Sequence, residues 1–150
     1  MVHICKKYGL SYDDQYSFLN YVIAICGEDQ FDLKTYTDNS LRLDLASRDF
    51  TMNALAYDLE AQEILDYMGG IEDIRRGIIR TSNLESFAEK PGNILRALRF
   101  SLEFNFRIEE ETYTAMQENV SAFEHIRSST LIKGMKKLLN GGRAHFIGDE

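Results

Sequence analysis

The sequence predicts an α+β fold, with a mixed β-sheet and flanking helices in the first half and helices alone in the second half. Apolar and polar residues alternate at strand spacing in FDLKTYT, and two short runs, LAYDL and EILDYM, are separated by polar residues; all three precede residue 69. From Phe87 onward the apolar residues recur at helical spacing. The pair Gly69 and Gly70 lies between the two patterns. We therefore divide the 150 residues into residues 1–72 and residues 73–150.

Four elements are expected in residues 1–72. Ser11 and Asp14 match a helix-capping pattern, and the apolar stripe behind them predicts a helix over Ser11–Cys26. FDLKTYT predicts a strand over Phe31–Thr37, and a helix is expected over Arg48–Leu55. The runs LAYDL and EILDYM, separated by polar residues, predict a β-hairpin.

Four helices are expected after the glycine pair. A short charged helix should cover Ile71–Arg76. Longer amphipathic patterns predict helices over Ile94–Phe104, Glu110–Phe123 and Ser129–Asn140. Turn residues such as Asn105 separate them.

The composition excludes several classes of protein. A net charge of −7 and a pI near 5.0 argue against a protein that coats nucleic acid by bulk electrostatic attraction, because that mode needs many cations. No apolar run approaches the roughly 18 residues of a membrane-spanning helix, so we expect a cytoplasmic protein without a membrane partner. Cys5 and Cys26 are expected to be reduced thiols. The histidines share no zinc-ligand spacing with them.

The stretch SRDFTMNALAYD places two charged residues, Arg48 and Asp49, before an apolar segment. An acid in a first helical turn is stabilised by the helix dipole, so Asp49 has a simple structural explanation. A cation is mildly unfavourable there, so Arg48 needs a phosphate or a neighbouring carboxylate as its partner. These residues alone leave a structural role and a ligand-binding role open.

Three longer strings narrow the choice. The chain carries SRDFTMNALAYD, then DYMGGIEDIRRGIIR, then FAEKPGNILRALRF followed by FRIEEET. Over roughly Phe31 to Leu139 this order resembles the class II tRNA nucleotidyltransferases, the family of CCA-adding enzymes and bacterial poly(A) polymerases. The resemblance implies part of a nucleotidyltransferase-type head with its mixed sheet, followed by an all-helical neck.

The resemblance also implies a nucleotide site for ATP or CTP. Arg48 and Asp49 match a motif that holds the triphosphate and ribose, since a guanidinium forks onto oxyanions and a carboxylate accepts from a hydroxyl. Ser47 departs from the second Arg that the family prefers. The full set of expected nucleotide-binding residues is Arg48, Asp49, Asn53, Glu89, Arg96 and Arg99. Arg96 and Arg99 have an alternative role as partners of acids such as Glu103.

Two further sets of residues follow from the resemblance. Asp66, Gly69, Gly70 and Asp73 match the joint between head and neck, where the glycines suit a hinge. The family reads the base with an Asp and an Arg, but Lys90 and Asn93 stand at those positions here. A lysine only donates hydrogen bonds, so we expect selection between CTP and ATP to be lost.

The metal-binding part of the family pattern is absent from this sequence. Nucleotidyl transfer in the family uses Mg²⁺ ions held by an Asp-x-Asp pair beside a Gly-rich loop. Neither string precedes FDLKTYT here, and a lone Asp32 or Asp58 is expected to serve a strand or a turn. We therefore expect no catalytic residue and no metal ligand in this chain.

Three hypotheses remain. In the first, the chain is a truncated or degenerate nucleotidyltransferase segment that is inactive alone. In the second, it is half of a split active enzyme. In the third, it is an RNA-binding or protein-interaction module. Lys133, Lys136 and Lys137 would contact RNA phosphates in the last case, although such a run also suits a solvated helix face. An incomplete sheet would need a cover, either the Ser11–Cys26 helix with its Phe18, Val22 and Ile25 stripe, a second copy, or a complementing chain.

Overall fold

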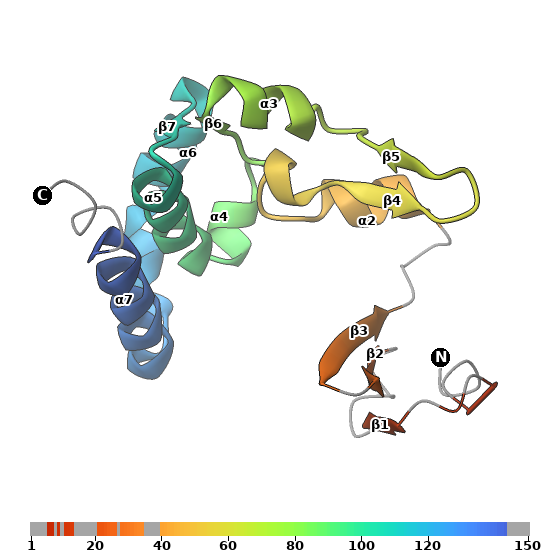
Figure 1. The fold of residues 1–150 in the computed structure, drawn as a ribbon. Helices are drawn as coiled ribbons and strands as arrows, with labels where there is room; N and C mark the ends of the chain where they lie inside the picture. The colour runs from red at the N-terminus through yellow and green to blue at the C-terminus, as the bar shows by residue number, and fades with distance from the viewer. Residues whose placement is uncertain are drawn as a thin grey trace, which may run out of the picture. The chain divides into compact units, whose positions relative to one another are not determined.

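The computed structural model describes residues 6–7, 9, 11–13, 21–26, 28–34 and 40–143 (Figure 1). The chain divides into two compact units, Met1–Asp44 and Leu45–Glu150, which are described one at a time. No helix among the described residues is both long and apolar enough to cross a membrane.

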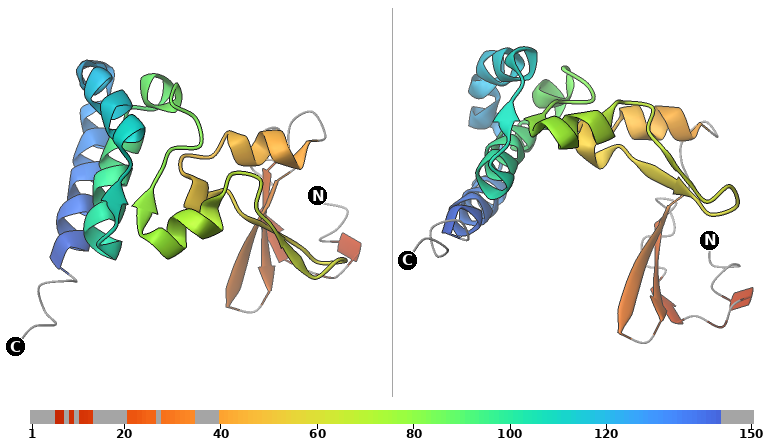
Figure 2. Two further views of the ribbon diagram at one scale, coloured as in Figure 1. Left: turned by 90° about the horizontal axis from the view of Figure 1, so that it is seen from above. Right: turned by 45° about the horizontal axis from the view of Figure 1, so that its top comes forward.

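The first unit contains a three-stranded antiparallel sheet in the order β1-β2-β3. Its strands are β1 (Ser11–Asp13), β2 (Tyr21–Cys26) and β3 (Asp29–Lys34). Figure 2 shows β2 and β3 as a paired ribbon, with Ala24 opposite Phe31. The strand predicted from Phe31 is confirmed as far as Lys34, and residues 35–37 lie outside the described residues.

The helix predicted over Ser11–Cys26 is wrong where the structure describes it, because Ser11–Asp13 and Tyr21–Cys26 are strands. Residues 14–20, including Phe18 of the expected stripe, lie outside the described residues. The run YVIAIC is apolar throughout, and periodicity alone cannot separate a buried strand from a buried helix in such a run. Its β-branched residues favour a strand, and pairing with β3 decides the outcome.

The predicted helix over Arg48–Leu55 is also wrong. An unpredicted helix, α2 (Leu41–Ala46), precedes it, and the motif itself holds a single 3₁₀ turn, η3 (Thr51–Asn53). Phe50 is extended and bridges Thr81, while the Thr51 amide donates to the Arg80 carbonyl at 3.0 Å. These non-local bonds hold the backbone out of a regular helix.

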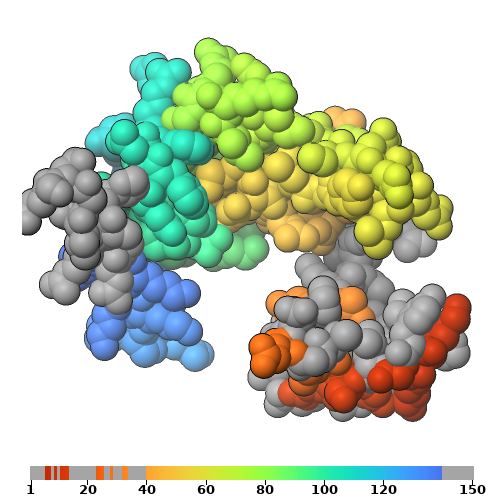
Figure 3. All heavy atoms as spheres, in the orientation of Figure 1, coloured from red at the N-terminus to blue at the C-terminus, as the bar shows by residue number. Residues whose placement is uncertain are grey.

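The predicted hairpin is confirmed as β4 (Ala56–Asp58) paired with β5 (Glu63–Leu65). It lies at the surface, yellow in Figure 3, and exposes the large apolar side chains Tyr57, Leu59 and Ile64.

The second half is mainly helical, as predicted, but it also contains a short parallel ladder. The predicted short helix is α3 (Gly70–Arg76). Strand β6 (Ile78–Ile79) pairs in parallel with β7 (Arg107–Ile108), which the helical interpretation missed. Two-residue strands leave too little alternation to predict from sequence.

Five helical segments complete the second unit: α4 (Ser86–Glu89), α5 (Gly92–Phe104), α6 (Glu110–Glu118), η4 (Val120–His125) and α7 (Ser128–Arg143). Helices α5 and α7 pack side by side (Figure 2). The helix predicted over Glu110–Phe123 ends early, and a 3₁₀ segment covers its last part. The core joins Phe50 and Ile79 to Phe87, Ala97 and Phe100. It therefore spans both sides of the predicted division at residue 72.

Candidate functional site

An open pocket in the second unit brings together residues from the first and third motif strings. We call it the Asp49 pocket; it is lined by Ser47, Arg48, Asp49, Asn53, Lys90, Asn93, Arg96 and Phe100. The segment before η3 supplies Ser47, Arg48 and Asp49, η3 itself supplies Asn53, and α5 with the loop before it supplies the rest. Four of the six predicted nucleotide-binding residues line this pocket. Glu89, at the end of α4, and Arg99, on α5, do not.

The Asp49 carboxylate is the organising group of the pocket. Its Oδ1 accepts from the Phe50 amide at 2.9 Å and from Asn53 Nδ2 at 3.0 Å. Its Oδ2 accepts from Arg96 Nε at 2.6 Å and from Arg96 Nη2. The side chain is only 13% exposed. Because a carboxylate offers about four acceptor sites, these four donors nearly saturate it.

This saturation changes the expected role of Asp49. A ribose hydroxyl can bind the carboxylate only by displacing one of its present donors. The geometry instead makes Asp49 a positioning residue, which fixes the Arg96 fork and the Asn53 amide at the pocket wall. The helix dipole offered for Asp49 plays no part, since η3 is a single turn.

Aromatic stacking further restrains the two arginines of α5. The guanidinium carbon of Arg96 lies 5.3 Å from the centroid of the Phe100 ring, and that of Arg99 lies 4.3 Å from it. Arg99 also binds Glu103 at 2.8 Å, which is the acid pairing that the sequence offered as its alternative role. Arg96 remains 45% exposed, so its outer edge is open to an anion.

The two residues at the expected base-reading positions, Lys90 and Asn93, both line the Asp49 pocket. Lys90 is exposed at the pocket wall, whereas Asn93 keeps only 9% of its surface accessible. The backbone N–H of Asn93 donates to the Lys90 carbonyl at 2.8 Å, but among the described residues nothing hydrogen-bonds to its side-chain amide, which carries both a donor and an acceptor. Together with Arg48 and Arg96, Lys90 gives the pocket lining three side chains that only donate hydrogen bonds.

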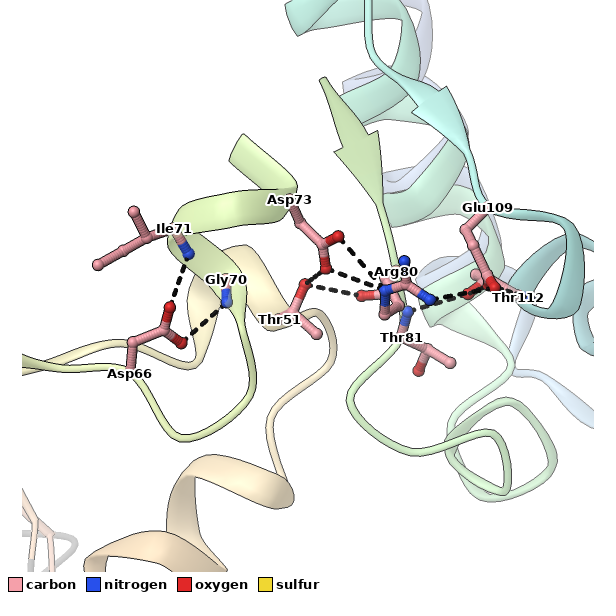
Figure 4. A network of polar contacts seen from close by, with 9 residues as sticks. All are labelled: Thr51, Asp66, Gly70, Ile71, Asp73, Arg80, Thr81, Glu109 and Thr112. Atoms are coloured by element: carbon pink, nitrogen blue, oxygen red, sulfur yellow. Dashed lines mark hydrogen bonds and ion pairs between the residues drawn. The ribbon is translucent and has the colours of Figure 1, made fainter. Parts of the chain in front are cut away.

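The residues predicted as a hinge form a well-bonded cap at the start of α3 (Figure 4). Asp66 accepts from the Gly70 amide at 2.8 Å and from the Ile71 amide at 2.9 Å. Burial raises the pKa of Asp66, but the amide bonds outweigh it, so the pKa is lowered overall. Gly69 has a φ of 75°, which favours glycine. A Cβ on Gly70 would meet the Thr51 carbonyl oxygen.

A partly buried ion-pair network continues from that cap into the helical half, and sequence reasoning missed it (Figure 4). Asp73 accepts from Thr51 Oγ1 at 2.8 Å and from Arg80 Nε at 3.1 Å. Arg80 Nη1 lies 3.1 Å from Glu109 Oε1, and Glu109 caps α6 through the Thr112 amide at 2.8 Å. The contacts tie α3 to α6, so they favour a rigid connection.

The same network shifts two pKa values. The hydrogen bond to Asp73 is the largest cause of the raised pKa of Arg80. Burial raises the pKa of Glu109, but the bonds from Thr112 and the charge of Arg80 outweigh it and lower the pKa overall.

No group of three or more metal-ligating side chains occurs among the described residues. Asp32 lies exposed on β3. Asp58 closes the hairpin turn by accepting from the Glu60 amide at 2.8 Å and the Ala61 amide at 3.0 Å, and these bonds lower its pKa. The described residues thus do not supply the ligand set of a two-metal site.

Comparison with known proteins identifies the family of the matched residues. Residues 19–80 match the family model of the poly(A) polymerase head domain. The CCA-adding enzyme of Staphylococcus saprophyticus is 41% identical over 100 residues, which cover 65% of this chain and 25% of that enzyme. The CCA-adding enzyme of Lactococcus lactis (strain MG1363) is 43% identical over 103 residues, covering 67% of this chain and 25% of that enzyme. Over the matched residues, the chain belongs to the tRNA nucleotidyltransferase and poly(A) polymerase family.

Solved structures of tRNA nucleotidyltransferases extend the match beyond the head. The Bacillus stearothermophilus CCA-adding enzyme in complex with CTP has a TM-score of 0.81 and 35% identity, covering 89% of this chain and 36% of that chain. The Thermotoga maritima CCA-adding enzyme complexed with tRNA has a TM-score of 0.76 and 31% identity, covering 87% and 32%. The α+β nucleotidyltransferase fold is thereby confirmed. The chain spans about a quarter of the length of the curated nucleotidyltransferases that it matches.

Proposed function

We propose that the Asp49 pocket binds a nucleoside triphosphate, as the nucleotide-binding part of a tRNA nucleotidyltransferase. In this assignment residues 1–72 belong to the head and residues 73–150 to the neck. The supporting observation is the convergence of Arg48, Asp49, Asn53 and Arg96 on one pocket, in a chain whose relatives include CCA-adding enzymes bound to CTP and to ATP.

The chemistry of the pocket suits a polyphosphate. Arg48 and the outer edge of Arg96 present fork-shaped donors that match phosphate oxygens. Asp49 holds Arg96 in place, so the cation is oriented before the ligand arrives, and little side-chain entropy is lost on binding. Asn53 and Asn93 offer neutral amides to the sugar or the base.

We propose further that these 150 residues bind a nucleotide but do not transfer it unaided. Transfer in the family is metal-assisted, and the described residues lack the ligand set for it. The metal-holding carboxylates would come from a complementing chain or segment.

Calorimetric titration with ATP and CTP in Mg²⁺ buffer tests the binding proposal. The wild-type chain should show saturable heat, and Arg48→Gln should reduce the affinity at least about fivefold, the loss of roughly one charge-assisted bond. Arg107→Gln is the matched control, because Arg107 is an exposed arginine that does not line the pocket. A folded wild-type sample that binds neither nucleotide contradicts the proposal.

A further inference from the structure

The β4–β5 hairpin carries an exposed apolar surface among acidic side chains. Tyr57 and Ile64 lie directly opposite each other in the ladder, so they share one face, and each is 57% exposed. Leu59, at the turn, is 83% exposed. The chain has no lysine, arginine or histidine from Asp49 to Ile74. The acids of the hairpin are Asp58, Glu60 and Glu63. We call these three apolar residues and three acids the hairpin surface; it suits a partner that is both apolar and cationic.

Helix α7 presents that combination. Ile132, Met135 and Leu139 are 54%, 42% and 65% exposed. Together with Lys136 they recur at helical spacing, so the four residues share one face, which we call the α7 surface. The helix contains three lysines and no acid. Its exposed face is therefore apolar and cationic.

The three lysines of α7 do not lie on one side of the helix. Lys133 and Lys137 line a groove toward α5, whereas Lys136 does not. A Cβ on Gly134 would lie 2.7 Å from Leu95 Cδ1, so this side of α7 packs against α5. The structure thus separates Lys136 from the lysines with which the sequence grouped it.

Charge determines which surfaces can pair. The hairpin and α7 lie at opposite ends of the second unit (Figures 1 and 2), so the two surfaces do not meet within one copy. Among the described residues, no salt bridge involves Glu60, Glu63 or Lys136. Two hairpin surfaces would place acid against acid, and two α7 surfaces would place cation against cation. A hairpin surface against an α7 surface instead buries both apolar sets and opposes unlike charges.

We propose that two copies of this chain associate by exchanging these surfaces, the hairpin surface of each copy on the α7 surface of the other. Two identical contacts related by a two-fold axis close the dimer, so no surface is left to extend a filament. Lys136 of one copy lies against the acids of the hairpin, Glu63 among them. The inference is independent of the proposed function, because neither surface lines the Asp49 pocket.

Sedimentation velocity of the full chain, up to about 100 µM, tests the proposal, since a dimer of micromolar affinity is largely formed there. Glu63→Lys and Lys136→Glu should each raise the dimer dissociation constant at least about tenfold, because like charges then meet at both contacts. Leu59→Ser should also weaken the dimer, because it removes apolar contact area. All three side chains are exposed, so folding should be kept, and thermal melting checks this.

Mixing two charge variants gives the sharpest result. In a mixture of Glu63→Lys and Lys136→Glu chains, one contact keeps its original charges and the other has both charges exchanged. The mixture should therefore form a heterodimer about as tight as the wild-type dimer, although each variant alone is largely monomeric. Lys137→Glu and Glu118→Lys are the matched controls, since they make the same charge changes at exposed residues outside both surfaces. Both should dimerise like the wild-type chain.

A wild-type chain that stays monomeric would overturn the proposal. Equal weakening by the controls would assign the effect to net charge and would also overturn it. Association that Glu63→Lys strengthens and Lys136→Glu leaves unchanged would indicate pairing of two hairpin surfaces instead. A mixture that fails to restore the dimer would rule out the exchange of surfaces.

Discussion

The Asp49 carboxylate accepts two guanidinium donors from Arg96, a residue 47 positions further along the chain. The bond joins the segment before η3 to the middle of α5, across the division predicted at residue 72. One carboxylate thus links the first and third family motifs and sets the shape of the pocket between them. Substitution of Asp49 should therefore act through the position of Arg96 and through the stability of the loop before η3.

Asp49→Asn should lower the free energy of unfolding by about 1–2 kcal/mol, because an amide keeps only one acceptor oxygen, so either the two Arg96 donors or the Phe50 and Asn53 donors lose their acceptor, and the charge is lost as well. Urea unfolding measures the change. Glu60→Gln removes an exposed acid outside the pocket and should stay within about 0.5 kcal/mol of wild type. Equal stability of Asp49→Asn and wild type would show that the Arg96 contact contributes nothing net.

Alanine should destabilise the chain at Gly70 much more than at Gly134. A Cβ at Gly70 meets the Thr51 backbone carbonyl, which cannot move without disturbing the core, so Gly70→Ala should cost about 2–4 kcal/mol. At Gly134 the nearest atom is the flexible Leu95 Cδ1 at 2.7 Å, and alanine is the better helix former by about 1 kcal/mol. Gly134→Ala should therefore lie within about 1 kcal/mol of wild type in the same urea experiment. Similar costs at both positions would argue against a backbone clash at Gly70.

Much of the fold could be predicted because its signals are local. Helix α5 has a long apolar periodicity, and the β4–β5 hairpin has two short runs on either side of polar residues. The run in β2 is apolar throughout and has no hydrophobic period, so the sequence does not distinguish a strand from a helix there. Pairing with β3 determines that it is a strand. At η3 the bridge from Phe50 to Thr81 overrides the local helical pattern.

The candidate site also has a part that the sequence predicted and a part that it did not. Motif resemblance placed Arg48, Asp49, Asn53 and Arg96 in one set, and the pocket joins them. The contact between Arg80 and Glu109 had no sequence signal, because both are ordinary charged residues whose pairing depends on the packing of β6 and α6. The hinge motion at the glycine pair stays a prediction, although the Asp66 cap and the Asp73 bonds favour a rigid joint.

Stability should fall in acid through Asp66 and Glu109. Both have pKa values lowered in the folded chain from ordinary values of 3.8 and 4.5. A lowered folded pKa stabilises the fold above the unfolded value, and this contribution disappears as pH falls through the folded value. The loss should therefore begin near pH 4.5 and continue below pH 3.8.

Glu109→Gln isolates this effect. The variant should be less stable than wild type at pH 7, and the difference should shrink between pH 5 and pH 3 in thermal melts, since only the carboxylate pairs with Arg80. Glu110→Gln, an exposed neighbour, is the control and should follow the wild-type profile. A constant difference at all pH values would assign the effect to packing instead.

The base-reading positions offer the sharpest test of how far this chain has diverged. Lys90 and Asn93 both line the Asp49 pocket, where the family pattern has an Asp and an Arg. A lysine cannot accept a hydrogen bond from the amino group of cytosine or adenine, so the wild-type chain should bind CTP, ATP, GTP and UTP within about threefold of one another. The double variant Lys90→Asp/Asn93→Arg restores one acceptor and one forked donor.

We expect the double variant to bind CTP and ATP about tenfold more tightly than GTP and UTP, since one well-placed hydrogen bond contributes roughly 1 kcal/mol and a mismatched donor costs at least as much. Calorimetric titration with the four nucleotides measures both chains. Lys90→Asp alone supplies the acceptor without the donor and should give an intermediate preference. Because Asn93 is largely buried, thermal melting must first show that the arginine is accommodated. A wild-type chain that already prefers CTP and ATP tenfold would mean that other groups in the pocket, such as the Asn53 amide, read the base.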